Sequence, residues 1–314
     1  MGLFAKAKKH EGWLATSFSA EGVCAAVVKR RAGDKPLVQA AVMYAGRKPL
    51  PAATLEKMNR DVHAQSYRST TLLGAGEYQL LMIDAPNVPL EELKTAVRWR
   101  LKDMIDFPAA DATVDVVDIP GDKNGPGRAQ SLFAVAARNS AVSQRQALYG
   151  ECKIALSVID IPEMAQRNIA GLMETQGRGL AMLSFDGEGG LLTVTSDGEL
   201  YLARRIDVTV AQLAETSDTQ RQQYYDKITL ELQRSFDHFD RQFHFITVAR
   251  LVLAPTGSDG LHAYLADNLY MPVEALDLAT LFDFSKVPDL LAAGGQARFF
   301  LALGAALRQE GMPA

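Results

Sequence analysis

The sequence predicts a two-lobed α/β fold in which one structural unit occurs twice. Its 314 residues exceed what one simple core needs and suit two lobes of ordinary size. Residues 12–29 and 180–207 share one plan, which is a strand, a turn of small residues and a second strand. Elsewhere, apolar segments of strand length alternate with amphipathic segments of helix length, as in α/β proteins. These two hairpins, one early in each half, indicate a duplicated fold that grips a phosphate between its halves.

The first half continues from its hairpin with alternating strands and helices. A short helix at 51–65 carries Leu55 and Met58 at helical spacing. A second helix begins after Pro89, which suits a first helical turn, and ends before Pro108. The other elements predicted in this half are strands at 13–18, 23–29, 37–44, 78–84, 113–119, 132–137 and 155–161 and helices at 140–150 and 162–174.

A break at 176–179 divides the chain into a first lobe, residues 1–178, and a second lobe, residues 179–314. A long helix at 218–247 carries an aromatic stripe, which is expected to pack against a sheet. The final helix, 299–308, is rich in alanine and is expected to pack back on the first lobe. The remaining predicted elements are strands at 251–254 and 272–276 and a helix at 261–269.

Composition limits the classes of function. Apolar residues make up 48% of the chain, charged residues 22%, and the net charge is -4, so no general electrostatic attraction to nucleic acid is expected. The only two cysteines, Cys24 and Cys152, fit a reducing compartment and give no metal-ligand spacing. No apolar run approaches the ~20 residues that span a bilayer. We therefore expect a cytoplasmic protein without a membrane span of its own.

The common signatures of catalytic and metal sites are missing. The loop at 121–128 lacks the Lys and Ser or Thr of a phosphate-binding P-loop. Gly74 and Gly76 precede a strand, whereas a dinucleotide-binding turn opens a helix. His238 and His244 are six residues apart, which places them on different faces of a helix and disfavours a metal site. The sequence therefore predicts neither catalytic residues nor metal ligands.

The two hairpins, the long helix and the closing segments together resemble the actin-like ATPase superfamily. Within it, residues 78–120 resemble pilus-assembly proteins of the PilM/MshI type, with AVRWR at 96–100 and IDFP at 105–108 most similar to MshI of the mannose-sensitive hemagglutinin (MSHA) pilus. The resemblance implies a two-lobed actin-like ATPase (ribonuclease H-like) fold with a small β-α-β subdomain inserted at 76–121. It also implies a cytoplasmic platform protein, peripheral to the inner membrane, that receives the cytosolic tail of a PilN/MshJ-like membrane protein.

A basic group on the inserted helix is the candidate contact with that partner. The exposed face of this helix is expected to carry Arg98, Arg100 and Lys102, which could meet an acidic or peptide partner. An ordinary solvated helix face explains the same residues equally well.

The nucleotide site departs from the family pattern. Where the family has Asp-x-Gly in the first hairpin, this chain has Ala15 and Ser17, and in the second hairpin it has Ser184 and Asp186. Side chains of a strand repeat every two residues, so Asp186 shares a face with Ser184 and could partly restore the missing acid. The residues left to hold a nucleotide are Asp186, Gly187, Gly189, Gly190, Gly257 and Gly260. We expect a degenerate site with no cofactor, and ATP with magnesium is the open alternative.

Three functions compete on this basis. The leading hypothesis is a non-catalytic scaffold of a type IV, MSHA-type pilus assembly platform. The second is a working ATPase of pilus assembly that depends on Asp186 and the glycines after it. The third is a GspL-like cytoplasmic domain of a type II secretion system, which is ranked last because that family continues into a membrane helix.

Overall fold

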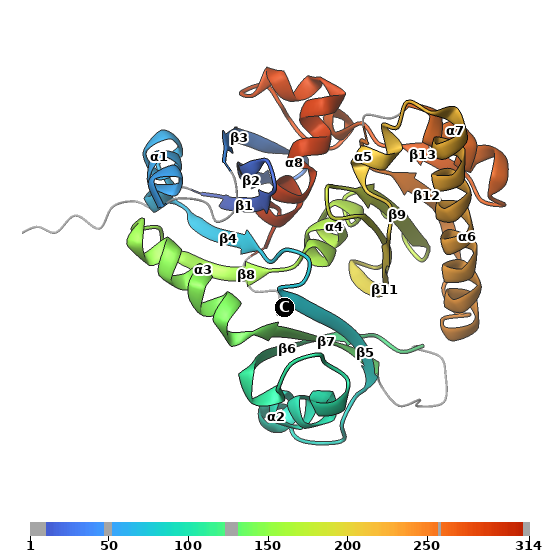
Figure 1. Cartoon of the computed structure of the whole chain (residues 1–314), viewed down its shortest axis with the longest axis horizontal. Helices are drawn as coiled ribbons and strands as arrows, with labels where there is room; N and C mark the ends of the chain where they lie inside the picture. The colour runs from blue at the N-terminus through green and yellow to red at the C-terminus, as the bar shows by residue number, and fades with distance from the viewer. Residues whose placement is uncertain (1–10, 47–51, 123–130, 257–258, 310–314) are drawn as a thin grey trace, which may run out of the picture.

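Two five-stranded sheets of the same topology form the frame of the protein in a computed structural model that describes residues 11–46, 52–122, 131–256 and 259–309 (Figure 1). The first sheet has the order β3-β2-β1-β4-β8, in which β1 pairs antiparallel with β2 and parallel with β4. Its strands are β1 (Trp13–Ser19), β2 (Gly22–Arg31), β3 (Asp34–Ala45), β4 (Arg68–Leu72) and β8 (Leu156–Asp160).

The second sheet repeats this arrangement with the order β11-β10-β9-β12-β13. Its first strand, β9, pairs antiparallel with β10 and parallel with β12, so the hairpins found in the sequence occupy equivalent places in the two sheets. Its strands are β9 (Gly179–Phe185), β10 (Gly190–Ser196), β11 (Glu199–Ile206), β12 (Val248–Leu253) and β13 (Val273–Ala275). The boundary between the predicted lobes stays a prediction.

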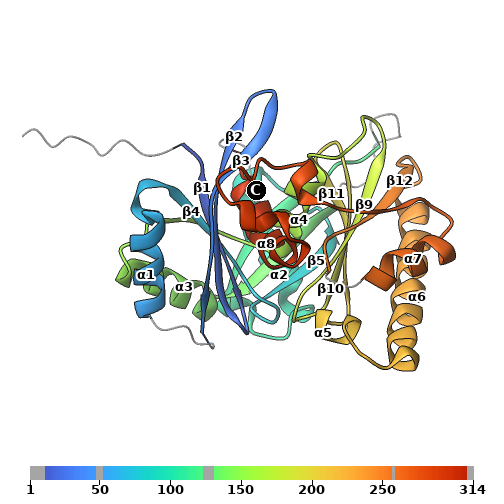
Figure 2. The same cartoon turned by 90° about the horizontal axis from the view of Figure 1, so that it is seen from above.

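Two helices, α4 (Pro162–Ala170) and α8 (Ala293–Ala306), lie between the two sheets (Figure 2). They approach each other closely, because a Cβ at Gly304 of α8 would lie only 2.2 Å from the carbonyl oxygen of Ala165 in α4. One hydrophobic cluster joins both helices to β1, β2 and β9. Both sheets therefore share a core, and α8 contacts the first sheet directly.

The outer faces of the sheets are covered by the other long helices (Figure 2). In α6 (Asp218–Gln242), one face is buried against the second sheet, as the aromatic stripe predicted. This helix ends at Gln242, five residues before the predicted end, because Phe243 leaves the helical conformation. The two main sheets are further accompanied by α1 (Ala52–Val62), α3 (Asn139–Glu151), α5 (Val210–Leu213) and α7 (Asp259–Asn268). None of the described helices is both long and apolar enough to cross a bilayer.

A third, three-stranded sheet forms the inserted subdomain, with α2 (Leu90–Arg100) on one face (Figure 1). Its order is β5-β7-β6, where β5 is Tyr78–Asp84, β6 is Ala112–Ile119 and β7 is Ser131–Arg138. The predicted range of 76–121 is therefore too short, since β7 lies between the other two strands. The sequence identified β7 as a strand, but local pattern does not specify which sheet a strand joins.

Two further predictions were wrong in detail. The predicted helix over 90–105 ends at Arg100, and the 3₁₀ turn Leu101–Asp103 follows it. The central strand β4 was missed, because its sequence RSTTL carries hydroxyl groups where a strand pattern needs apolar residues. Ser69 and Thr71 are nevertheless fully buried, and their hydroxyls are hydrogen-bonded to Ala155 O and to Arg145.

Candidate functional site

The first hairpin has no acid at position 15, where the resemblance implies an aspartate. Ala15, which stands at the position of the family's aspartate, is fully buried and belongs to the apolar cluster shared with α4 and α8. The next residue, Thr16, is also fully buried and is hydrogen-bonded to the Tyr149 hydroxyl. A methyl group cannot ligate magnesium, which takes oxygen ligands. Position 15 therefore offers no ligand to a metal ion.

The corresponding position in the second hairpin is committed to internal hydrogen bonds. Ser184 Oγ donates to Gln166 Oε1 over 2.6 Å. The Gln166 amide nitrogen in turn donates to Met182 O at 2.8 Å and Thr193 Oγ1 at 2.9 Å. Gln166 lies on α4 and is fully buried, so this network fixes α4 against the second sheet. Ser184 thus has a structural role in this protein.

Asp186 turns its carboxylate into its own turn. Its Oδ1 accepts hydrogen bonds from the backbone N–H of Glu188 at 2.7 Å and of Gly189 at 3.1 Å. Burial raises the pKa of Asp186, and the hydrogen bond from the Glu188 amide and the charge of Arg205 act in the opposite direction. Backbone amides in such a turn are the groups that would otherwise surround a phosphate. In this protein Asp186 already occupies two of them.

The glycines of this turn serve the packing of the hairpin itself. Gly189 has φ +137°, and a Cβ there would lie 2.9 Å from Ile206 O. A Cβ at Gly190 would lie 2.7 Å from the Phe185 ring, whereas one at Gly187 would meet open space. Two of these three glycines are thus required without any ligand.

The structure brings only part of the predicted nucleotide set together. Asp186, Gly187, Gly189 and Gly190 share one turn. Gly260 lies at the start of α7, where a Cβ would lie 3.1 Å from the Tyr225 hydroxyl. Gly257 lies outside the described residues. No group of three or more His, Cys, Asp or Glu side chains in the described part of the chain could hold a metal ion.

A carboxylate crosses the cleft from the second hairpin to the loop before β5. Glu188 Oε2 accepts a hydrogen bond from the backbone N–H of Ala75 at 2.7 Å. The neighbouring amide of Gly74 donates to Glu77 Oε2 at 2.7 Å, and Arg145 forms a 2.9 Å ion pair with the same carboxylate. The amides of Gly74 and Ala75 are therefore held by two carboxylates, one of which comes from the opposite sheet. Sequence reasoning missed Glu188, because a glutamate in a turn is an ordinary surface residue.

A polar triad of two buried residues, Tyr78 and Glu163, and the partly exposed Arg205 lies beside this contact and joins three parts of the molecule. Glu163 of α4 accepts from the Tyr78 hydroxyl of β5 at 2.5 Å and from Arg205 of β11 at 3.1 Å. Arg205 also donates to Tyr78 Oη at 2.8 Å. Burial and the charge of Glu163 hold the pKa of Tyr78 well above its ordinary value. Burial alone would lower the pKa of Arg205, but Glu163 and Tyr78 outweigh it and the pKa is raised.

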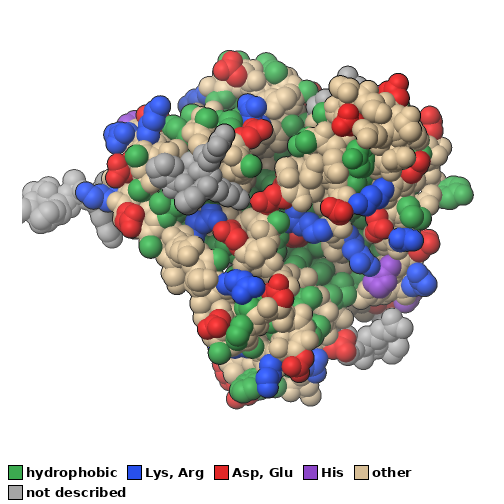
Figure 3. Space-filling view, viewed as in Figure 1, with side chains coloured by type: hydrophobic (Ala, Val, Ile, Leu, Met, Phe, Trp, Pro, Cys, Tyr) green, Lys and Arg blue, Asp and Glu red, His purple; other side chains and the backbone are tan. Residues whose placement is uncertain are grey.

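The predicted basic group lies on the surface of the inserted subdomain. Arg98, Arg100 and Lys102 are all exposed, and Arg100 donates a 2.7 Å hydrogen bond to Asp84 O at the end of β5. Trp99 lies among them and is 72% exposed. Charged side chains of both signs are scattered over the face seen in Figure 3 and around its central hollow. The basic residues are thus a local feature around an exposed indole.

No protein-family model and no curated protein matches this sequence. Among solved structures, a chain of the PilM–PilN type IV pilus biogenesis complex is similar, with a TM-score of 0.71, 22% identity and coverage of 95% of this chain and 98% of that chain. A Bacteroides thetaiotaomicron protein with an actin-like ATPase fold and unknown function has a TM-score of 0.51, 13% identity and coverage of 93% and 99%.

The cytoplasmic domain of EpsL, an inner-membrane component of the type II secretion system of Vibrio cholerae, is less similar. Its TM-score is 0.43, its identity 15% and the coverage 67% of this chain and 76% of that chain, too low a likeness to support the GspL alternative. The first two comparisons and the repeated sheet topology confirm the predicted fold class. The chain has the two-lobed actin-like ATPase fold with an inserted subdomain.

Proposed function

We propose that this protein is a non-enzymatic scaffold of a type IV pilus assembly platform, of the PilM/MshI type and belonging to an MSHA-type system. Its task is to bind the cytosolic tail of an inner-membrane protein of the PilN/MshJ type, which would hold it at the cytoplasmic face of that membrane. The observation that carries this proposal is the turn at 186–189, where Asp186 occupies the amides that a phosphate would need. The fold shared with a chain of the PilM–PilN complex supports the assignment to a type IV pilus assembly platform.

Nucleotide binding would have to break contacts that the protein already makes. The Glu188–Ala75 hydrogen bond connects the second hairpin to the loop before β5, and at such an exposed position it contributes about 0.5–1.5 kcal/mol. Opening would also disturb the hydrogen-bonded triad of Tyr78, Glu163 and Arg205. No aspartate at position 15 or 184 offsets these costs through a metal ion. Weak or absent ATP binding is therefore part of the proposal.

The surface around Trp99 is the proposed contact for the partner's tail. Exposed aromatic residues and arginines are enriched among the residues that carry binding energy at interfaces. Trp99 is exposed between Arg98 and Arg100, and Lys102 follows on the same segment. This combination suits a tail with an apolar residue next to acidic ones.

The test is a calorimetric titration of the chain with a synthetic peptide of the cytosolic tail of the PilN-like protein. We expect saturable binding that is the same with and without Mg–ATP. Trp99→Ala should weaken binding by about tenfold or more, as for a residue at the centre of an interface. Tyr270→Ala, which removes a fully exposed aromatic side chain elsewhere on the surface, is the matched control and should leave binding unchanged. Absence of binding under both conditions would contradict the proposal.

A further inference from the structure

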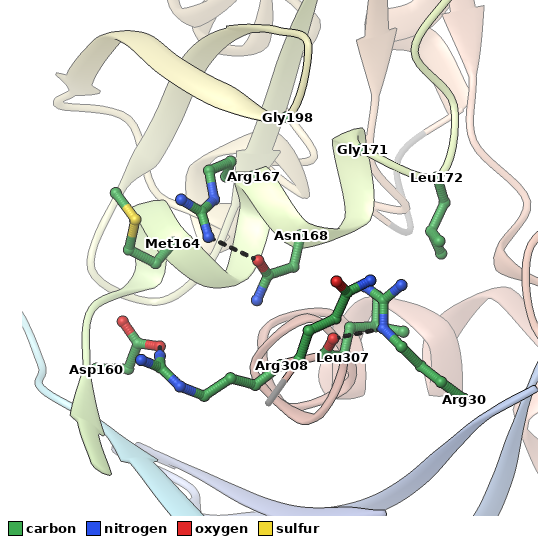
Figure 4. A pocket seen from close by; sticks show the side chains of 11 residues that line it. Arg30, Asp160, Met164, Arg167, Asn168, Gly171, Leu172, Gly198, Leu307 and Arg308 are labelled. Carbon is green, nitrogen blue, oxygen red and sulfur yellow. Dashed lines mark hydrogen bonds and ion pairs between the residues drawn. The ribbon is translucent and has the colours of Figure 1, made fainter. Parts of the chain in front are cut away.

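A hollow of about 170 Å³ lies at the C-terminal end of α8 and is lined by three arginines (Figure 4). Arg30 comes from β2, Arg167 from α4, and Arg308 follows α8. On α4, Arg167 comes one helical turn after Glu163, yet neither Glu163 nor Gln166 is among the residues that line the hollow. The hollow therefore does not include the α4 side chains that contact Tyr78 and Ser184.

The positive charge around this hollow is only partly balanced. Arg308 forms a 2.7 Å ion pair with Asp160, so this carboxylate already balances the charge of one of the three arginines. Arg167 is 4.0 Å from Glu199, the limit of an ion pair. Arg30 has no acidic partner among the described residues, and its one hydrogen bond runs from Nε to Leu307 O at 2.7 Å. At least one guanidinium charge thus faces the hollow without a counter-charge from the described chain.

Capping of α8 accounts for only part of this arrangement. A cation at a helix C-terminus is favourable, and Arg30 Nε provides this interaction through Leu307 O. The two terminal nitrogens of Arg30 are not needed for the cap. Figure 4 shows Arg30 and Arg167 on opposite sides of the hollow, with Asn168 between them. Burial lowers the pKa of Arg30, so holding this charge away from water opposes folding.

Besides the polar side chains of Asp160, Asn168 and Gln309, the wall has an apolar part that sets the kind of ligand. Met164, Leu172 and Leu307 line the hollow together with the arginines. Its volume of about 170 Å³ equals that of five or six waters at about 30 Å³ each, which is too small for a nucleotide. The planar fork of a guanidinium matches a carboxylate, and the apolar wall matches methylene groups.

We propose that this hollow binds a carboxylate on a short aliphatic chain, as in a glutamate side chain or a small dicarboxylic acid. Arg30 and Arg167 would contact the carboxylate, and Met164 and Leu172 would contact its methylene groups. This site does not depend on the pilus proposal, since it uses neither the cleft nor the surface around Trp99.

The test uses glutarate as the probe, titrated into the chain by calorimetry at constant ionic strength. We expect saturable binding that Arg30→Gln weakens by about tenfold or more, because it removes a charge-assisted hydrogen bond. Arg30→Lys keeps the charge but loses the fork, and it should bind glutarate more weakly than the unaltered chain and more tightly than Arg30→Gln. Arg31→Gln is the matched control, because Arg31 is the next residue and pairs with Asp283 at the surface. This control should bind glutarate normally.

A second arm replaces glutarate with inorganic phosphate at the same ionic strength. We expect weaker binding, because phosphate leaves the apolar wall uncovered. Should Arg30→Gln fold poorly, Arg167→Gln supplies the same comparison from the other side of the hollow. The proposal is overturned if glutarate shows no saturable binding, if Arg31→Gln weakens it as much as Arg30→Gln does, or if phosphate binds more tightly than glutarate.

Discussion

At the scale of single residues, Gly304 and Asp186 serve the packing and the local folding of this chain. Gly304 lets α8 approach the backbone of α4, and these two helices carry the core that both sheets share. Asp186 looks like a surviving nucleotide residue in the sequence, yet its carboxylate closes a turn within a single hairpin. In both cases the chemistry of the residue is used for packing or local folding.

Replacing Gly304 with alanine is expected to destabilise the protein by about 3 kcal/mol or more, since the added Cβ would lie 2.2 Å from a backbone oxygen that cannot easily move. The measurement is the free energy of unfolding from denaturant titration. Gly294→Ala is the control in the same helix, where a Cβ meets open space, and it should be neutral or stabilising by up to about 1 kcal/mol. Equal stability of the two variants would contradict this account of helix packing.

At the scale of elements, the β9–β10 hairpin and the loop before β5 act as one closed unit. The hairpin supplies Glu188, and the loop supplies the amide of Ala75 that it binds. The adjoining residue Glu77 is held by Arg145 of α3. The contact thus connects the second sheet to the segment between β4 and β5, which are elements of the first sheet and of the inserted subdomain.

Glu188→Ala is expected to free the Ala75 amide and to speed its hydrogen exchange by about tenfold or more, because local opening then no longer breaks a charge-assisted hydrogen bond. The free energy of unfolding should change by no more than about 1–3 kcal/mol. Residue-resolved hydrogen exchange is the measurement. Glu231→Ala, which removes an exposed ion pair with Arg234 on α6, should leave the exchange of Ala75 unchanged. Unchanged exchange in the Glu188 variant would show that the cross-cleft contact is not formed in solution.

Elements with a local sequence pattern could be predicted, whereas pairing between distant residues could not. Long amphipathic elements such as α6 and the two hairpins were predicted because their patterns are local. Strand β4 escaped because its buried groups are hydroxyls, and the place of β7 between β5 and β6 depends on pairing between distant residues. The sequence alone shows that positions 15 and 184 carry no acid, whereas the contact of Glu188 with Ala75 can be seen only in the folded chain.

For the whole molecule, the two sheets are connected through a continuous buried structure. A single hydrophobic cluster runs from β1 through α4 and α8 to β9 and β12. The triad of Tyr78, Glu163 and Arg205 adds a polar connection among the inserted subdomain, α4 and β11. A large movement of the two sheets away from each other would expose the hydrophobic cluster and the triad to water. The arrangement seen here is therefore expected to persist when nucleotide is added.

Mg–ATP is accordingly expected to leave the melting temperature of the protein unchanged. A ligand present at 100 times its dissociation constant adds about 2.7 kcal/mol to the stability of the folded state, which a thermal melt would detect. The control is magnesium chloride at the same ionic strength, which separates nucleotide binding from a salt effect. A saturable rise in melting temperature that requires ATP would favour the ATPase interpretation.

The carboxylate of Glu188 is tethered by the chain to the amide that it binds. The folded chain holds the two groups together although they are 113 positions apart in the sequence, so the carboxylate acts at a high effective concentration. A soluble anion has to compete with a group that never diffuses away. Under the proposed scaffold function, this contact is therefore expected to form when the protein folds and to change little with the nucleotide concentration around it.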